Sequence, residues 1–567
     1  MYVRTSTRKT SDGRSVRYLQ LAHNEWDPAV QRSRTKVLYS FGREDDLDRA
    51  GIQRLVAALS RLLDPAAAAS ATAPGGLEFT EARPLGGVHV LDALWRRLGI
   101  DAALRARLSG RRLGERAERI LFALVANRAL APSSKLAATS WIAHDVHIDG
   151  LDTVVDEACY RAMDWLLEVE PALAEEVFHA TAHLLNLEVD LLFFDTTSTY
   201  FETDEADDPV GRDEHGHRVG DDAEPVSEAG FRSFGKSKDH RDDLPQVIVG
   251  MAVTRDGIPV RCWCWPGNTA DSALIRQVKA DMRAWSLARV VWVADRGFAS
   301  AANRRFLQQG GGHYILGEKL RGGTPAADAA LSRQGRYQTV RDNLQVKEVR
   351  LAPDLADDRF VVCYNPAEAE RDAATRARHV AALTELIDGT DTLPRSRRDE
   401  LAGVISTKPH LKRYLRRTPG GLLRVDAAAI KTEANLDGKY LLRTSDPTLS
   451  TEDIALGYKQ LLEVERGWRT MKQVIDLRPV YHRKEDRIRA HVILCWLALL
   501  HIRIIETTTG RTWPTVRDEL QRLQAITYTG PAGTFRQTTT LTKTQRDLLT
   551  ALDIEAPKKI LDLATRG

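Results

Sequence analysis

Two aspartates follow apolar segments that have the composition of buried strands. Asp195 ends the segment LLFFD (191–195), and Asp295 ends the segment VVWVAD (290–295). A carboxylate at the carboxyl end of a buried strand lies at the edge where α/β sheets usually bind ligands. Two such carboxylates on neighbouring strands repel each other and need a cation, and hard oxygen ligands select Mg²⁺ or Mn²⁺. For each aspartate alone, a loop-start or capping role is the alternative.

A third acid, Glu465, lies in a segment (450–475) with helical periodicity. At about 100° per residue, Glu465, Arg469 and Lys472 share a stripe at the border of the apolar face. Glu465 could therefore point along the rim of a sheet, and the two cations could hold phosphates beside it. The alternative is a surface ion-pair ladder, because Glu465 and Arg469 form an i,i+4 pair.

Three carboxylates can hold two divalent cations about 3.5–4 Å apart, one activating the attacking oxygen and one stabilising the leaving oxygen. This arrangement suits phosphodiester cleavage and transfer, and it needs neither a protein nucleophile nor an organic cofactor. The sequence contains no P-loop, dinucleotide fingerprint or serine-nucleophile elbow. A glycosidase fits the carboxylates but not the Arg/Lys stripe beside Glu465.

The segments around the two aspartates predict an α/β sheet. A strand pair (246–267), a helix (271–285), the strand that ends at Asp295, a second helix (300–310) and a strand (313–320) follow one another. This order predicts a sheet that is antiparallel at one side and parallel elsewhere. A further strand is expected at 437–446.

The charge distribution is uneven, although the 567 residues carry a net charge of only +3. Residues 1–43 contain nine basic and three acidic side chains and a hairpin signal at Asp12-Gly13. This basic ribbon could follow a phosphate backbone, or it could be a solvated hairpin. The helical segment 88–185 could contain a helix-turn-helix-like module or form a plain bundle with arginines outside.

Membrane, secreted and zinc-ribbon proteins are not expected. The apolar run VILCWLALL (492–500) is too short to span a bilayer, and no apolar signal region follows the N-terminus. None of the five cysteines has zinc-ribbon spacing. Cys262 and Cys264 alternate with Trp263 and Trp265 on one strand. Packing of the two tryptophans in the core is favoured over their stacking on bases.

Four stretches together resemble bacterial insertion-sequence transposases of the DDE class, specifically the insertion-sequence-four family. They are FFDTTSTYFE (193–202), residues 235–272, VADRGFAS (293–300) and YKQLLEVERGWRTMK (458–472), and residues 477–499 extend the likeness. In the family signature Tyr-x2-Arg-x3-Glu-x6-Lys, the matching residues are Tyr458, Glu465 and Lys472. Leu461 stands at the arginine position, and Arg466 or Arg469 might replace that phosphate contact.

The resemblance implies an RNase H-like catalytic core with a mainly β insertion between Asp295 and Glu465, preceded by a helical domain and a small β-rich segment. The expected organisation is a basic β-rich segment with a helix (1–64), a linker (65–87), a helical DNA-binding domain (88–187), the catalytic domain (188–320 and 437–505), the insertion (321–436) and a C-terminal region (506–567).

The resemblance also implies the reaction and its residues. Asp195, Asp295 and Glu465 would be the catalytic acids and the ligands of Mg²⁺, for which Mn²⁺ would substitute. Water would cleave a phosphodiester at the transposon end, and the freed 3′-OH would attack target DNA. The residues expected to contact DNA are Tyr458, Lys472, Arg469, Arg466, Lys236, Lys238, His240 and Arg241.

The partners implied are double-stranded DNA, as terminal inverted repeats and as target, and a second copy of the chain in a synaptic homodimer. The expected location is the prokaryotic cytoplasm, with the nucleoid. Two alternatives remain open at this point: an RNase H-like metal-dependent nuclease that does not join strands, and a catalytically lapsed DNA-binding relic or repressor.

Overall fold

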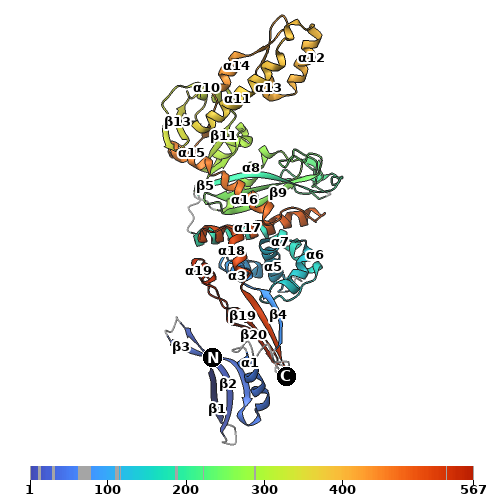
Figure 1. Ribbon diagram of the computed structural model, residues 1–567, viewed down its shortest axis with the longest axis vertical. Coiled ribbons are helices and arrows are strands. Elements are labelled where there is room, and N and C mark those ends of the chain that lie inside the picture. The colour runs from blue at the N-terminus through green and yellow to red at the C-terminus, as the bar shows by residue number, and fades with distance from the viewer. Residues whose placement is uncertain are drawn as a thin grey trace. The chain divides into compact units, whose positions relative to one another are not determined.

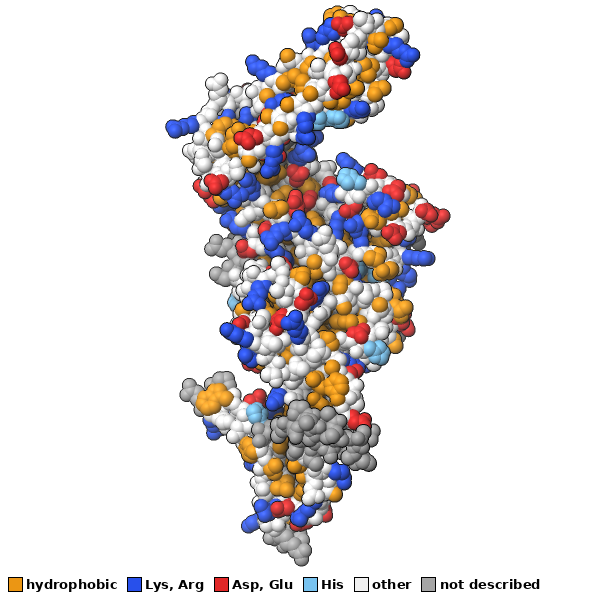
Figure 2. All heavy atoms as spheres, viewed as in Figure 1, with side chains coloured by type: hydrophobic (Ala, Val, Ile, Leu, Met, Phe, Trp, Pro, Cys, Tyr) orange, Lys and Arg blue, Asp and Glu red, His pale blue; other side chains and the backbone are white. Residues whose placement is uncertain are grey.

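The computed structural model describes residues 2–9, 15–27, 32–61, 78–108, 114, 116–185, 190–220, 222–285, 289–530 and 533–565 (Figure 1). The chain divides into two compact units. The smaller comprises Met1–Gly86, Glu519–Asp547 and Glu555–Gly567, and the larger comprises Gly87–Asp518 and Leu548–Ile554. Charged side chains of both signs are interspersed over the face of the larger unit in Figure 2.

A nine-stranded mixed sheet forms the centre of the larger unit, in the order β12-β13-β14-β17-β11-β10-β5-β8-β9. The strands are β5 (Leu191–Tyr200), β8 (Gln246–Thr254), β9 (Pro259–Pro266), β10 (Val291–Ala294), β11 (His313–Glu318), β12 (Gln338–Arg341), β13 (Leu344–Arg350), β14 (Arg359–Tyr364) and β17 (Lys439–Thr444). Only β5, β10 and β11 pair in parallel. The sheet is therefore antiparallel at both sides, whereas the sequence pattern predicted this at one side only.

Helix α17 (Glu485–Thr509) forms the apolar core beside this sheet and packs against β9, α5 and α7. Among the described residues, it alone is long and apolar enough to cross a membrane, with a mean hydropathy of 1.8 in its best window. The helix extends well beyond the apolar run at 492–500, so the length argument from that run was wrong. However, 94% of the window is buried, as in the core helix of a folded domain.

The segment before the sheet is helical, as its periodicity predicts. Its elements are α3 (Gly86–Arg97), α4 (Ile100–Leu108), α5 (Arg116–Leu130), α6 (Lys135–Ser140), the π-helix η2 (Trp141–Asp145) and α7 (Asp156–Leu185). The prediction that arginines lie outside is wrong for α5. Arg119 is buried and forms ion pairs with Glu118 and Asp92. Arg128 is also buried; it lies near Cys495 of α17 and donates to the carbonyl oxygen of Asp476.

The expected insertion, 321–436, contains more helix than strand, so its description as mainly β is wrong. Strands β12 to β14 extend the large sheet, and α10 (Pro325–Ser332) packs against β14. A separate apolar cluster centred on Leu383 and Ile405 joins the remaining elements. These are α11 (Pro366–Ile387), α12 (Arg395–Ser406), α13 (Pro409–Lys412), α14 (Ala427–Ala434) and the hairpin β15 (Leu415–Arg417) and β16 (Leu423–Val425). The sequence pattern predicts a charged helix at 367–388, which agrees with α11, whereas the charged start of α12, RSRRDE, has no apolar residue to indicate a helix.

The smaller unit contains two antiparallel sheets. The first, β1 (Tyr2–Lys9), β2 (Ser15–Asp27) and β3 (Arg32–Arg43), precedes α1 (Arg49–Arg61); the Asp12-Gly13 turn lies outside the described residues. The second contains β4 (Glu78–Pro84), β18 (Gln524–Gly530), β19 (Gly533–Thr538) and β20 (Ile560–Thr565). Residues 65–77 of the expected linker (65–87) lie outside the described residues, and residues 78–84 form a strand instead of a linker.

The other regular elements are short. They are β6 (Val210–Arg212), β7 (Ser227–Ala229), α8 (Asp271–Asp281), α9 (Ala301–Gln308), α15 (Thr451–Lys459), α16 (Leu462–Gln473), α18 (Trp513–Leu520) and α19 (Lys543–Ala551). The described residues also form the 3-10 turns η1 (Glu44–Asp46), η3 (Arg283–Trp285), η4 (Arg296–Phe298), η5 (Gln309–Gly311) and η6 (Thr390–Thr392).

Candidate active site

Asp195 and Asp295 lie side by side on the large sheet. Strands β5 and β10 pair in parallel with Phe194 opposite Ala294, so the two aspartates occupy the next position of the same register. Burial raises the pKa of Asp195, and the negative charges of Asp295 and Asp271 add to this effect, while the Lys238 ammonium opposes it. The sheet therefore brings together the first two acids that the sequence singled out.

Asp195 lies within β5 and not at its end, unlike the sequence prediction. Strand β5 continues to Tyr200 and keeps its pairing with β8, whereas β10 stops at Ala294. Beyond Asp195, β5 therefore has no β10 partner. The Asp195 side chain is 25% exposed, which is enough for a ligand to reach it.

Lys238 is the cation beside the first acid. Its ammonium lies 3.6 Å from Asp195 Oδ1 and 3.3 Å from Asp271 Oδ2, and it donates to the carbonyl and hydroxyl oxygens of Thr196 at 2.6 Å. Asp271 is the first residue of α8 and was not among the sequence candidates. Its only signal was an acid two residues after the turn Gly267-Asn268-Thr269, at the start of a helical pattern.

Tyr458 contacts the second acid. Its hydroxyl, on α15, donates to Asp295 Oδ1 at 3.0 Å. Burial and the Asp295 charge both raise the pKa of Tyr458 well above its usual value, so the phenol remains a donor. Tyr458 therefore orients a carboxylate here, whereas the resemblance implied a phosphate contact.

Glu465 does not join the two aspartates. Within the described ranges, no three side chains of His, Cys, Asp or Glu lie close enough together to hold a metal ion. Glu465 is exposed in the first turns of α16, which packs on β5 and β8. Gly467 of α16 lies against Met251, the partner of Asp195 in the β5–β8 register, so the helix covers the correct strands. The carboxylate of Glu465 nevertheless faces solvent.

The expected single helix at 450–475 is two helices, with a break at Gln460–Leu461 between α15 and α16. Arg466 pairs with Glu463 at 2.8 Å, and Arg469 is exposed. The described contacts of α16 include no Glu465–Arg469 ion pair, so the surface-ladder alternative is not realised. Burial lowers the pKa of Lys472, whose ammonium contacts Asp239 Oδ1 at 3.0 Å.

The predicted phosphate contacts at 236–241 lie in one loop beside β5. Lys236 and His240 are exposed, and His240 has a φ of 58°, in the left-handed region. Arg241 pairs with Asp243 at 2.9 Å and stacks on Tyr200. The backbone N–H of Lys238 donates to Ser198 Oγ at 2.9 Å, which fixes the loop along the strand that carries Asp195.

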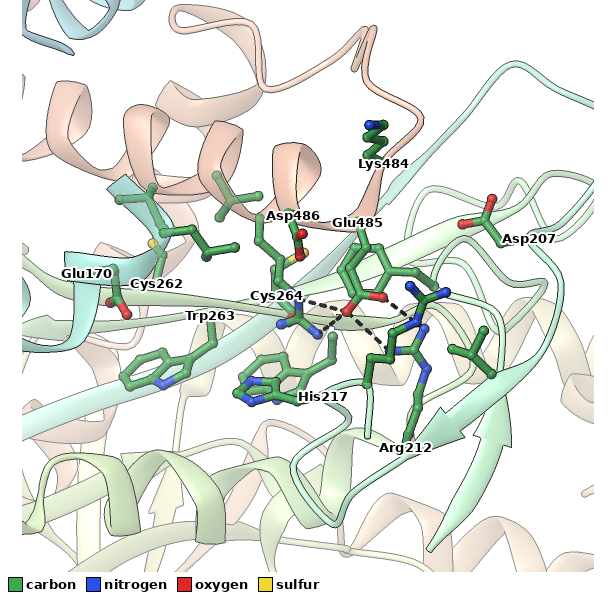
Figure 3. Close-up of a pocket in the computed structure, with 18 of the residues that line it drawn as sticks. Glu170, Asp207, Arg212, His217, Cys262, Trp263, Cys264, Lys484, Glu485 and Asp486 are labelled. Carbon is green, nitrogen blue, oxygen red and sulfur yellow. Dashed lines mark hydrogen bonds and ion pairs between the residues drawn. The ribbon is translucent and has the colours of Figure 1, made fainter. Parts of the chain in front are cut away.

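A cavity of about 860 Å³ lies along edge strand β9, and Figure 3 shows the side chains that line it. Arg212 and Arg489 both pair with Glu485, so these charges are satisfied internally. Trp263 and Trp265 are buried, stack on each other and donate to α8, which agrees with the favoured prediction of core packing. None of the three predicted acids lines this cavity.

The donors around Asp195 and Asp295 fit a divalent cation chemically. They are carboxylate oxygens, which Mg²⁺ and Mn²⁺ prefer, and an ammonium already lies against Asp195. Asp195 and Asp295, two of the three ligands that the resemblance implies, thus follow aligned positions of neighbouring strands, whereas Glu465 is exposed on α16. Transposases of this class generally depend on divalent metal ions.

Comparisons with known proteins identify the class of protein. Residues 219–500 match the family model "Transposase DDE domain", and residues 3–70 match "IS1634 family transposase, N-terminal domain". A search of curated proteins found no match. A cryo-EM structure of the piggyBac transposase synaptic complex with hairpin DNA aligns over 76% of this chain and 78% of that chain, with 9% identity and a TM-score of 0.33. A likeness this low carries no argument.

The insertion-sequence-four assignment within the DDE class was wrong, because the N-terminal match is to the IS1634 family. The stretches that carried the resemblance lie at 193–499, in the catalytic half, whereas residues 3–70 distinguish the family. The chain thus combines an IS1634-family N-terminal domain with a transposase DDE domain, and it is a DNA transposase of the DDE class.

Proposed function

We propose that Asp195, Asp295 and Glu465 are the catalytic acids of this transposase, in an RNase H-like core. There the chain would cleave phosphodiesters at transposon inverted-repeat ends and join the freed 3′-OH to target DNA. The parallel register that aligns Asp195 with Asp295 is the observation that carries this proposal. The repulsion between the two carboxylates, together with burial, makes the pair a receptor for positive charge.

In the first step, a water oxygen attacks the phosphorus and the bond to the 3′ oxygen breaks; that oxygen takes a proton and becomes the 3′-OH. In the second step, this hydroxyl attacks a target phosphorus and displaces a target 3′ oxygen. A divalent cation bound by the acids, Mg²⁺ or in its place Mn²⁺, would activate the attacking oxygen and neutralise charge at the leaving one.

The residues of the chain prepare the site for these steps. Tyr458 orients Asp295 through its hydrogen bond, and the Lys238 ammonium favours the ionised form of Asp195, against the effect of burial. Glu465 joins them when DNA binding reorients α16, with the helix break at Gln460–Leu461 as the hinge. The exposed cations Lys236, Arg466 and Arg469 are proposed to contact the DNA backbone, together with His240, Arg241 and Lys472.

We further propose that DNA sequence is read by the basic sheet at 1–43 and by the helical segment 88–187, since phosphate contacts alone carry no sequence information. The region 321–436 is proposed as an insertion in the catalytic domain 188–320 and 437–505. Two copies of the chain would pair the two transposon ends in a synaptic homodimer.

Variants of the three acids test the catalytic assignment. Asp195→Asn, Asp295→Asn and Glu465→Gln should each lower Mg²⁺-dependent cleavage of inverted-repeat DNA by about 10³-fold or more, with end binding retained. Glu452→Gln, an exposed acid on neighbouring α15, is the matched control and should cleave normally. Normal cleavage by Glu465→Gln would remove Glu465 from the triad. Cleavage without transfer to a target plasmid in the parent chain would favour the nuclease alternative.

A further inference from the structure

We infer that Lys472 and Arg478 form a binding site for a backbone phosphate of DNA, and that the carboxylate of Asp239 fills this site in the DNA-free chain. The inference rests on the active site proposed above, and it deepens that proposal by adding Arg478, which no sequence signature indicated. Asp239 would act as an internal substitute that the DNA strand displaces.

The contacts of Asp239 are those that a phosphate would accept. Lys472 Nζ lies 3.0 Å from Oδ1 and 3.2 Å from Oδ2, and Arg478 donates to Oδ2 at 3.0 Å. Both oxygens are used, and the two donors come from α16 and from the segment after it. A phosphodiester likewise presents two unesterified oxygens that share one negative charge, and charged donors of this type bind it strongly.

The site holds more positive charge than Asp239 neutralises. Burial lowers the pKa of Lys472, the hydrogen bond and charge of Asp239 oppose this, and the neighbouring charges of Arg478 and Lys238 lower it further. Two cations, Lys472 and Arg478, thus contact one carboxylate. Such an excess is unfavourable in a purely structural ion pair, whereas it is typical of a surface that binds nucleic acid.

Arg478 is held in place by an aromatic ring. Its guanidinium lies 4.6 Å from the ring centroid of Tyr200, the last residue of β5, and Arg241 lies 5.1 Å from the same centroid. A stacked guanidinium loses less side-chain entropy when it binds an anion. Tyr200 therefore presents Arg478 from the end of the strand that carries Asp195.

The position relative to Asp195 suits a phosphate next to the one that reacts. Lys238 and Asp239 are consecutive, and they point to Asp195 and to the Lys472–Arg478 pair respectively. Arg478 also supplies the second cation that Leu461 cannot. Of the earlier candidates for that role, Arg466 is paired with Glu463 and Arg469 lies exposed on α16.

Binding of fluorescently labelled duplex DNA to the full chain, with metal removed by chelation, tests this inference. Asp239→Asn should tighten binding about 3- to 10-fold, because the internal competitor loses its charge. Asp208→Asn, an exposed acid in the same unit, makes the same change in net charge and should have little effect. Weaker or unchanged binding by Asp239→Asn would overturn the inference.

The salt dependence of binding tests Arg478 directly. Arg478→Gln should weaken DNA binding and reduce the slope of log K against log[salt] by about one, the value for one lost phosphate contact. Arg483→Gln is the matched control, since Arg483 is exposed five residues further on and its loss should leave the slope unchanged. An unchanged slope in Arg478→Gln, with a normal melting temperature, would refute the phosphate site.

Two further measurements complete the test. At equal ionic strength, inorganic phosphate should weaken DNA binding only slightly more than chloride does. If phosphate instead competes strongly with DNA for the parent chain but not for Arg478→Gln, the site binds free phosphate, and this would contradict a DNA-backbone site. Arg478→Lys keeps the charge, so it should retain the salt slope even if its affinity falls. Because these assays contain no metal, their failure is separate from a failure of the Asp195 and Asp295 variants to lose cleavage.

Discussion

Replacing Lys238 by methionine should tighten the binding of divalent metal at Asp195. The Lys238 ammonium lies 3.6 Å from Asp195 Oδ1 and 3.3 Å from Asp271 Oδ2, so it competes with a metal ion for the same carboxylate. Methionine keeps most of the length and apolar character of the side chain while it removes the charge. The variant therefore tests whether this ammonium occupies a cation site.

The size of the effect follows from the distance. Two unit charges 3.6 Å apart attract by about 1 kcal/mol in water and by about 5 kcal/mol at an effective dielectric of 20. The Lys238 side chain is 35% exposed, so solvent screening favours the low end, about 1–2 kcal/mol. This corresponds to an affinity for metal that is about 5- to 30-fold tighter. Loss of the ammonium also raises the pKa of Asp195 further. The increase in metal affinity should therefore be largest at neutral pH and above, where this carboxylate is ionised.

Calorimetric titration of the metal-stripped chain with Mn²⁺ measures this affinity. Lys236→Met is the matched control, because Lys236 is exposed in the same loop and is absent from the contacts of Asp195. Its affinity for Mn²⁺ should equal that of the parent chain. If Lys238→Met binds Mn²⁺ no more tightly than the parent at pH 7.5 or above while its melting temperature is retained, the reasoning fails.

The remaining predictions concern stability. Burial lowers the pKa of the core histidines, to about 3 for His482 and about 4 for His501. Because the unfolded chain takes up these protons first, the free energy of unfolding falls as pH drops below 6.5, by about 1.4 kcal/mol per pH unit for each histidine. Urea unfolding of His501→Leu should therefore show a pH slope reduced by one proton below pH 6, and an unchanged slope would mean that His501 titrates normally. Gly250→Ala should cost about 1–3 kcal/mol, because its Cβ would lie 2.6 Å from the Trp265 ring, whereas Gly403→Ala, with open space on α12, should stabilise by up to about 1 kcal/mol. Equal unfolding midpoints for the two glycine variants would contradict this packing.

The neighbouring positions of Asp195 and Asp295, the first two acids proposed to be catalytic, could be predicted from the sequence because their signal is local. The apolar runs before Asp195 and Asp295 form β5 and β10, and apolar strands next to each other in a buried sheet align the residues that follow them. The burial of Trp263 and Trp265 could be predicted for the same reason, since their neighbours along the strand are apolar. The resemblance of four stretches to known transposases indicated the DDE class, though not the family that residues 3–70 match.

Other features depend on residues that are distant along the chain, and no local pattern encodes them. Lys472 and Asp239 are separated by 233 positions, and Tyr458 and Asp295 by 163. Whether a charged side chain pairs, stays exposed or faces a metal site is set by which elements pack against it. For this reason periodicity placed Glu465 at the border of a buried face but could not foresee that it points to solvent, or that Lys238 and Asp271 approach Asp195.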